Sequence, residues 1–142
     1  MSVFAVDASL VIKWFVPEIH SEAARRWLDA SHDYVAPDLL FLEIGNVVWK
    51  KVRRRELEEA EARQLVMDLA HVAVDTVATQ GLLQDALAVA LTTGITVYDG
   101  MYLTLAVRLD TELITGDDRF ADRIAAHPLL APHVRRLQDF VE

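Results

Sequence analysis

The chain has 142 residues, of which 53% are hydrophobic and 25% are charged, a balance typical of a globular protein with one core. It contains no cysteine, which excludes a disulfide scaffold and zinc sites built from thiolates. We find no signal peptide and no apolar run of the roughly 20 residues that a membrane span needs, so we expect a single cytoplasmic domain, residues 1–142. The net charge of −8 argues against a protein that binds nucleic acids nonspecifically over its whole surface.

Short apolar runs alternate with amphipathic stretches along the chain, and they predict strands and helices respectively. The predicted strands, in chain order, are residues 3–6, 34–36, 72–77, 95–98, 113–115 and 134–137. The predicted helical segments are residues 9–15, 21–30, 37–54, 58–70, 82–92, 100–109 and 119–126. Pro37 suits the start of a helix, and Gly94 is typical of the position just past a helix end. This alternation predicts an α/β fold, a three-layer α/β/α sandwich around a mostly parallel sheet.

Acidic residues follow three of the predicted strands. Asp7, Asp99 and Asp117 come after the first, fourth and fifth strands. In an open parallel sheet, ligands bind outside the carboxyl ends of the strands, so we expect these side chains to meet in one crevice. Glu43 lies within a very apolar predicted helix. Because gathered carboxylates repel each other unless a hard cation neutralises them, the pattern predicts a Mg²⁺ or Mn²⁺ site and chemistry on phosphates.

Each acid also has an ordinary structural interpretation. An aspartate after a strand is commonly a turn former or the N-cap of the next helix, and a lone glutamate in a helix commonly faces solvent. Taken together, however, four acids at corresponding positions of the predicted fold favour a shared metal site. Ser9 and Thr115 stand two positions from an aspartate, where a hydroxyl can orient the carboxylate or cap the local backbone. Asn46 follows Glu43 by one helical turn, and Asp118 is a weaker candidate.

Basic residues are concentrated in one segment. They are Lys50, Lys51, Arg53, Arg54 and Arg55. Such a patch can attract a polyanion even to an acidic protein, and the first four are our candidates for RNA contacts. The same residues are also favoured at a helix C-terminus by the helix dipole. By contrast, the five histidines are scattered, and we interpret them as surface or structural groups: His20, His32, His71, His127 and His133.

Four segments resemble the motifs of PIN-domain nucleases: Val6-Asp7-Ala8-Ser9, Glu43 with Asn46, Tyr98-Asp99-Gly100-Met101-Tyr102, and Thr115-Gly116-Asp117-Asp118-Arg119-Phe120. The resemblance extends over residues 3–140, and the length and helix order are similar to those of VapC-type ribonuclease toxins from type II toxin–antitoxin pairs. Gly100 departs from the alanine that is more usual after the third acid. This change affects helix propensity rather than chemistry.

The resemblance implies a metal-dependent endoribonuclease with catalytic, metal-binding acids at four positions: Asp7, Glu43, Asp99 and Asp117. It implies supporting roles for three polar residues: Ser9, Asn46 and Thr115. The cofactor would be Mg²⁺ or Mn²⁺, the substrate RNA, and the partners a cognate antitoxin protein and a second copy of the chain.

Three other classes of protein are compatible with parts of the pattern. A receiver-type phosphoacceptor domain needs adjacent acids at the first strand and a lysine after a late strand, and the chain has neither. A phosphatase with an aspartyl nucleophile needs a second acid two positions after Asp7, where Ser9 stands. The third alternative is a PIN fold that binds RNA or protein without catalysis, and an intact set of four acids counts against it.

Overall fold

The computed structural model describes residues 2–142. The strands are β1 (Val3–Val6), β2 (Asp33–Pro37), β3 (Asp75–Val77), β4 (Leu113–Thr115) and β5 (Val134–Arg136). The α-helices are α1 (Ala8–Val11), α2 (Ser21–Asp29), α3 (Leu39–Arg53), α4 (Glu59–Leu69), α5 (Leu83–Thr93), α6 (Val97–Arg108) and α7 (Asp118–Ala125). Three short 3₁₀ helices are η1 (Ile12–Trp14), η2 (Thr79–Leu82) and η3 (Ala131–His133). The predicted α/β class is confirmed.

The five strands form one parallel sheet in the order β3-β2-β1-β4-β5. From the central strand β1 the chain adds β2 and β3 on one side, and then β4 and β5 on the other. The register pairs Ala5 with Leu113 and Val6 with Ile114. The order therefore reverses between β1 and β4, and sheets of this kind bind ligands at such a switch point, outside the carboxyl ends of the strands.

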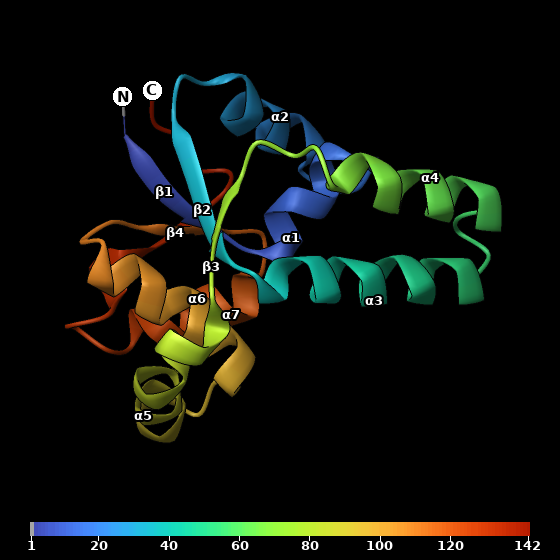
Figure 1. The fold of residues 1–142 in the computed structure, drawn as a ribbon. Helices are drawn as coiled ribbons and strands as arrows, with labels where there is room; N and C mark the ends of the chain where they lie inside the picture. Colours follow the sequence, from blue (N-terminus) through green and yellow to red (C-terminus); the bar gives the residue numbers. More distant parts are fainter. Residues whose placement is uncertain (1) are drawn as a thin grey trace.

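Helices cover both faces of the sheet (Figure 1). α6 packs against β1 and β2 on one face. α2 lies on the other face, where the Trp27 ring packs edge-on against Phe4 of β1 with 5.3 Å between the ring centres. α3 and α4 extend away from the sheet as a paired arm (Figure 1). The layers are those of the predicted α/β/α sandwich.

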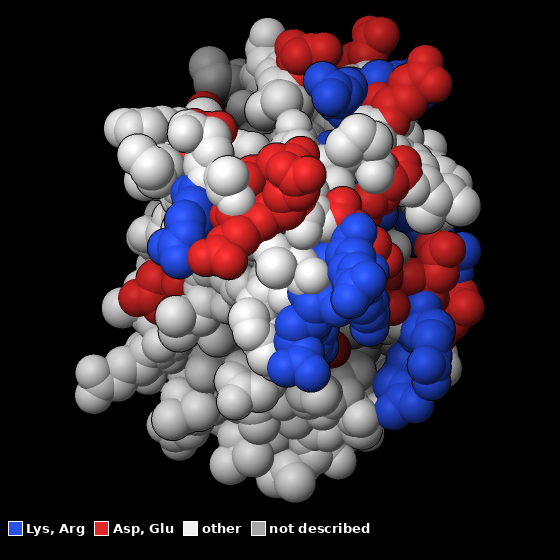
Figure 2. Space-filling model, turned by 90° about the vertical axis from the view of Figure 1, so that its right-hand side faces the viewer, with Lys and Arg blue, Asp and Glu red and all other residues white. Residues whose placement is uncertain are grey.

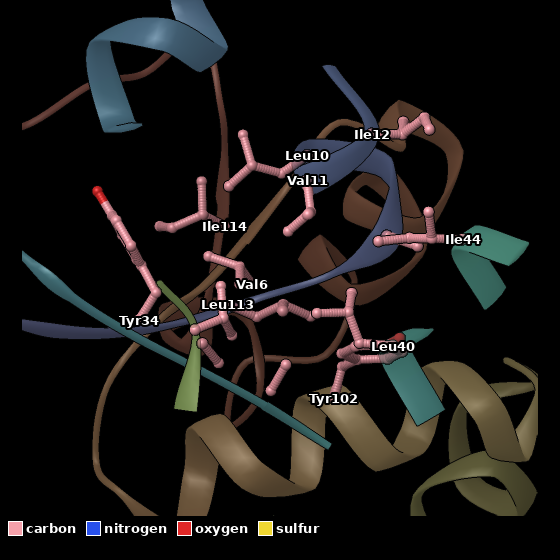
Figure 3. Packing of buried hydrophobic residues seen from close by; sticks show 14 of the residues in the cluster. Val6, Leu10, Val11, Ile12, Tyr34, Leu40, Ile44, Tyr102, Leu113 and Ile114 are labelled. Atoms are coloured by element: carbon pink, nitrogen blue, oxygen red, sulfur yellow. The ribbon is translucent and has the colours of Figure 1, made fainter. Parts of the chain in front are cut away.

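The core joins the strands to the base of the arm (Figure 3). Leu40, Ile44 and Val48 of α3 are buried at i, i+4 and i+8, so one stripe of this helix faces the core. Full burial of each such side chain contributes roughly 1.5–3 kcal/mol. This stripe fixes the rotation of α3 and therefore the position of Glu43, which is half-buried beside Ile44.

The predicted strand at residues 95–98 is wrong. The segment contains three β-branched residues, but Gly94 ends α5 in the left-handed conformation, with φ of 79°. Thr96 then caps α6, and its Oγ1 accepts the Asp99 backbone N–H at 3.1 Å. Only residues 94–96 separate the two helices, which leaves no room for a strand. Asp99 consequently lies in the first turn of α6 rather than after a strand.

Other boundaries also differ from the prediction, among them those at Pro37 and at the third strand. Pro37 is the last residue of β2, opposite Val77 of β3, and α3 begins only at Leu39. The third strand covers residues 75–77 rather than 72–77, because the Val74 N–H bonds to the Val72 carbonyl in a turn at 2.9 Å.

α5 and α6 pack closely against each other. A Cβ atom at Gly100 would lie 2.7 Å from the Ala86 carbonyl oxygen, which accounts for glycine where alanine is more usual. Within residues 2–142 no single helix is long and apolar enough to cross a membrane. The segments Thr79–Thr93 and Val97–Arg108 reach the required length and apolar character only together, and they are bent by 111° relative to each other.

Candidate active site

Asp7 stands at the carboxyl end of β1 and caps the N-terminus of α1. One carboxylate oxygen accepts the Ser9 hydroxyl at 2.5 Å and the Leu10 N–H at 3.2 Å, and the other accepts the Thr115 hydroxyl. Burial raises the pKa of Asp7 from 3.8 to about 6, against the lowering effect of these hydrogen bonds. The carboxylate is therefore held in a fixed orientation in a partly desolvated place.

Hydrogen bonds connect the turn after β4 to the turn after β1. The Gly116 N–H donates to the Ser9 hydroxyl at 2.8 Å, and the Asp117 N–H donates to the Thr115 hydroxyl at 3.1 Å. A Cβ atom on Gly116 would lie 3.1 Å from the Ser9 carbonyl oxygen and 2.8 Å from Leu137 Cδ2, so glycine favours the close approach of the two turns. Asp117 caps α7, where its carboxylate accepts the Phe120 N–H at 3.1 Å.

Asp99 interacts electrostatically with acids on the helices and with acids at the strand ends. Its pKa is raised to about 6, mainly by burial and then by repulsion from Glu43 and from Asp117. Asp99 in turn contributes to the raised pKa of Asp7. Asp99 therefore lies within electrostatic reach of each of the other three predicted acids, although Asp99 and Glu43 come from helices rather than from strand ends.

These acids offer oxygen ligands only, which is the donor set preferred by hard cations such as Mg²⁺ and Mn²⁺. Within residues 2–142, none of them forms an ion pair with a lysine or an arginine. In the same part of the chain, no three His, Asp or Glu side chains converge as a group that could hold a metal ion. The acids thus fit a hard cation in chemistry and charge, but they are not arranged as a ready-made coordination shell.

Comparison with known proteins identifies the family. Residues 4–125 match the PIN domain. The chain is 36% identical over 123 residues to Ribonuclease VapC3 of Pyrobaculum aerophilum, across 85% of this chain and 94% of that protein. This chain belongs to the VapC group of the PIN-domain family. It is also 30% identical over 116 residues to Ribonuclease VapC1 of Mycobacterium tuberculosis, across 82% of this chain and 86% of that protein.

Solved structures agree with the PIN fold. PAE2754 from Pyrobaculum aerophilum aligns with a TM-score of 0.65 at 22% identity, over 86% of this chain and 79% of that chain. VapC20 of Mycobacterium tuberculosis, a Sarcin-Ricin loop cleaving toxin, aligns with a TM-score of 0.66 at 12% identity, over 84% and 93% of the two chains. A toxin–antitoxin complex from Klebsiella pneumoniae gives 0.63 at 15% identity, over 94% and 97%. At these identities the likeness concerns the fold alone.

The predicted supporting residues of this PIN-domain protein have different surroundings. Ser9 and Thr115 contact Asp7 directly, as described above. Asn46 is exposed on α3 one turn after Glu43, and it makes no side-chain hydrogen bond within the described part of the chain. Asp118 lies 3.8 Å from Arg136 in an ion pair, outside the group of four acids.

The basic block lies at the outer end of α3. Figure 2 views the tip of the arm, where basic side chains lie beside acidic ones. Lys50, Arg53 and Arg54 are exposed and form no ion pair among residues 2–142, and the Arg53 guanidinium lies 5.0 Å from the centre of the Trp49 ring. Lys51 differs, because its ammonium is 2.8 Å from one oxygen of Glu18 and its side chain is only 13% exposed.

Tyr102, a residue with no predicted functional role, is a neighbour of the acids. It is 1% exposed in the core below α3 (Figure 3), and its hydroxyl has no hydrogen-bond partner of ordinary geometry within residues 2–142. Burial, followed by the nearby Glu43 carboxylate, raises the pKa of Tyr102 well above its usual value. The sequence signal was a tyrosine three positions after Asp99, which ordinary core packing would explain equally well.

Proposed function

We propose that this PIN-domain protein is a metal-dependent endoribonuclease that hydrolyses RNA phosphodiester bonds. The catalytic and metal-binding residues are Asp7, Glu43, Asp99 and Asp117, with Mg²⁺ or Mn²⁺ as the cofactor. The observation that carries the proposal is the hydrogen-bonded contact between the turn of Asp7 and the turn of Asp117, in a group of acids that form no ion pair with a lysine or arginine of residues 2–142. The relatives named ribonucleases support the same activity.

The chain's own residues hold the reacting groups in place. A divalent cation held by these acids would lower the pKa of a bound water and offset negative charge on the phosphate. Asp7 and Asp117 are our first choices for direct ligands. The hydroxyls of Ser9 and Thr115 keep the Asp7 carboxylate oriented, and the first turn of α7 does the same for Asp117. Asp99 and Glu43 complete the acidic group or orient the attacking water.

RNA is bound in part by the basic residues on α3. Lys50, Arg53 and Arg54 are exposed cations without carboxylate partners in the described part of the chain, as phosphate contacts require. Lys51 contributes less to RNA binding, since Glu18 already neutralises it. Asn46, exposed one turn after Glu43, keeps its proposed supporting role for the acids.

The protein acts as the toxin of a toxin–antitoxin pair, with a cognate antitoxin that covers the acids and a homodimer as the assembly. Solved toxin–antitoxin complexes of the same fold support this proposal.

The whole chain forms one domain. The PIN-domain match ends at residue 125, yet β5 pairs with β4 beyond that point and Leu137 is fully buried.

The test is incubation of the purified protein with structured RNAs, with and without Mn²⁺, beside the Asp7→Asn variant. We expect cleavage only by the wild type with metal, and a loss of more than about 100-fold in Asp7→Asn, because even outer-sphere partners of metal ligands affect activity by 10–100-fold. Asp29→Asn, in an exposed acid of α2, is the matched control and should cleave normally. RNA binding without cleavage under every condition would instead indicate a catalytically silent PIN fold.

A further inference from the structure

Two arginines share a hollow with two of the proposed catalytic acids. Asp99 and Asp117 line a hollow of about 400 Å³ together with Arg119 and Arg123 of α7. The remaining walls are Gly94, Ile95, Thr96 and Phe120. Neither arginine lies within ion-pair distance of a carboxylate among residues 2–142. Acidic and basic groups thus face the same space without neutralising each other.

Helix α7 carries its charges on separate faces. Asp118 and Asp122, four residues apart, both pair with Arg136 of β5. Arg119 and Arg123, also four residues apart, occupy the neighbouring face, where like charges at this spacing repel each other. Within residues 2–142 the acidic pair therefore shares a counter-charge in Arg136, whereas the basic pair forms no ion pair.

The two arginines are held differently. Arg123 Nη1 donates to the Gly94 carbonyl at 2.9 Å, which anchors its guanidinium against the end of α5 and leaves its other N–H groups available. Arg119 is exposed and makes no side-chain hydrogen bond within residues 2–142. One guanidinium is thus oriented in advance, and the other is free to adapt to a ligand.

We propose that Arg119 and Arg123 form a subsite for a backbone phosphate of the RNA, next to the phosphodiester that is cleaved at the acids. This inference rests on the proposed function. A guanidinium matches phosphate oxygens through two parallel N–H bonds, and such contacts position a strand without reading its sequence. On a protein of net charge −8, a local positive pair also attracts the RNA to a site that is otherwise acidic.

The test compares Arg119→Ala with Arg63→Ala, which removes an exposed arginine of α4 that is paired with Glu59. Binding of a short single-stranded RNA is measured over a salt series, in an Asp7→Asn background that keeps the RNA intact. For Arg119→Ala we expect Kd at low salt to rise about tenfold, and the slope of log K against log salt to fall by about 0.7, as for one lost phosphate contact. Arg63→Ala should change neither value.

Kinetics and a second variant separate the subsite from a structural role. With Asp7 intact, Arg119→Ala should raise KM and leave kcat within about twofold, because the contact is made in both ground and transition states. Arg119→Lys should restore the salt slope while recovering only part of the affinity. Lysine keeps the positive charge but lacks the two parallel N–H donors of the guanidinium. Arg119 is exposed and makes no side-chain hydrogen bond or ion pair within residues 2–142, so its variants are not expected to unfold.

Three results would overturn the inference. Unchanged Kd and salt slope in Arg119→Ala, while the wild type binds and cleaves RNA, would reject the subsite and leave the proposed function standing. Weaker binding of a protein partner with unchanged RNA affinity would reassign the arginines to that partner. A wild-type protein that neither binds nor cleaves RNA would overturn the subsite and the proposed function together.

Discussion

Asp7, at the end of β1, is held by two hydroxyls and a backbone N–H, whereas Glu43, on α3, accepts no hydrogen bond of ordinary geometry from residues 2–142. The strand-end part of the site is thus oriented by its own hydrogen bonds. The helix part, Glu43 and Asp99, is positioned by the packing of α3 and α6 and is pushed apart by like charge. The first part is therefore preorganised, whereas the second depends on a counter-ion.

The largest expected effect is stabilisation by a divalent cation. A ligand that binds only the folded state stabilises it by about 2.7 kcal/mol at 100 times its Kd. For a domain of this size that corresponds to a rise in Tm of roughly 5–10 °C. Thermal unfolding with EDTA and with Mn²⁺ measures the shift, and Asp7→Asn should reduce it sharply. An identical shift in that variant would place the cation away from Asp7.

Removing a hydroxyl from the preorganised part should cost stability. Thr115→Val keeps the shape of this fully buried side chain but deprives Asp7 of a donor and the Asp117 N–H of an acceptor. We expect a loss of about 2 kcal/mol in the free energy of unfolding, measured with urea at pH 7.

Thr104→Val is the matched control for that experiment. Thr104 is also buried, at 3% exposure, but its hydroxyl has no partner in the described chain. Its replacement should be neutral or stabilising. If both valine variants lost the same stability, the network around Asp7 would not be the cause.

The two parts of the site also differed in how well the sequence predicted them. Asp7, Thr115 and Asp117 were placed correctly because parallel strands bring their carboxyl ends to one edge, which the alternating pattern predicts. For Asp99 the sequence predicts a strand end, because three β-branched residues precede it, and the structure shows the first turn of a helix instead. Gly94 ends α5 and Thr96 caps α6, so the short connection between them leads directly into a helix. The β propensity of this segment does not take those tertiary constraints into account.

Residues on exposed helical faces were the least predictable. A run of cations in the sequence does not tell which of them meets a carboxylate, and only the fold brings Glu18 to Lys51 across 33 positions. For the same reason Arg119 and Arg123 did not stand out, because their hollow is assembled from the ends of three helices. Pairing of this kind depends on long-range packing rather than on periodicity.

Acidification should stabilise the metal-free protein. The pKa values of Asp7 and Asp99 are raised to about 6 in the folded state from 3.8, so the folded protein holds these protons more tightly than the unfolded chain. Their contribution to stability is therefore present at low pH and is lost as the pH rises through 6. Between pH 7 and pH 5 we expect a gain of about 1–2 kcal/mol from this coupled pair, measured by urea unfolding in EDTA.

Variants assign that pH dependence to the site. Asp7→Asn and Asp99→Asn should each flatten the profile between pH 5 and pH 7, whereas Asp29→Asn should leave it unchanged. A wild-type stability that falls over the same acidification would mean that the raised pKa values of Asp7 and Asp99 do not govern stability in this pH range.

The smallest expected effect concerns the hydroxyl of Tyr102, which lies below the helix part of the site. A buried hydroxyl without a partner costs free energy, so Tyr102→Phe should raise the free energy of unfolding of the metal-free protein by about 1 kcal/mol. Tyr34→Phe is the matched control, because the Tyr34 hydroxyl is also buried but donates to the Trp27 carbonyl, and its loss should destabilise. A higher free energy of unfolding in Tyr102→Phe, together with a lower one in Tyr34→Phe, would support the absence of a partner for the Tyr102 hydroxyl. A destabilised Tyr102→Phe would instead indicate that Glu43 accepts this hydroxyl in solution, and that the helix part is more firmly held than its hydrogen bonds suggest.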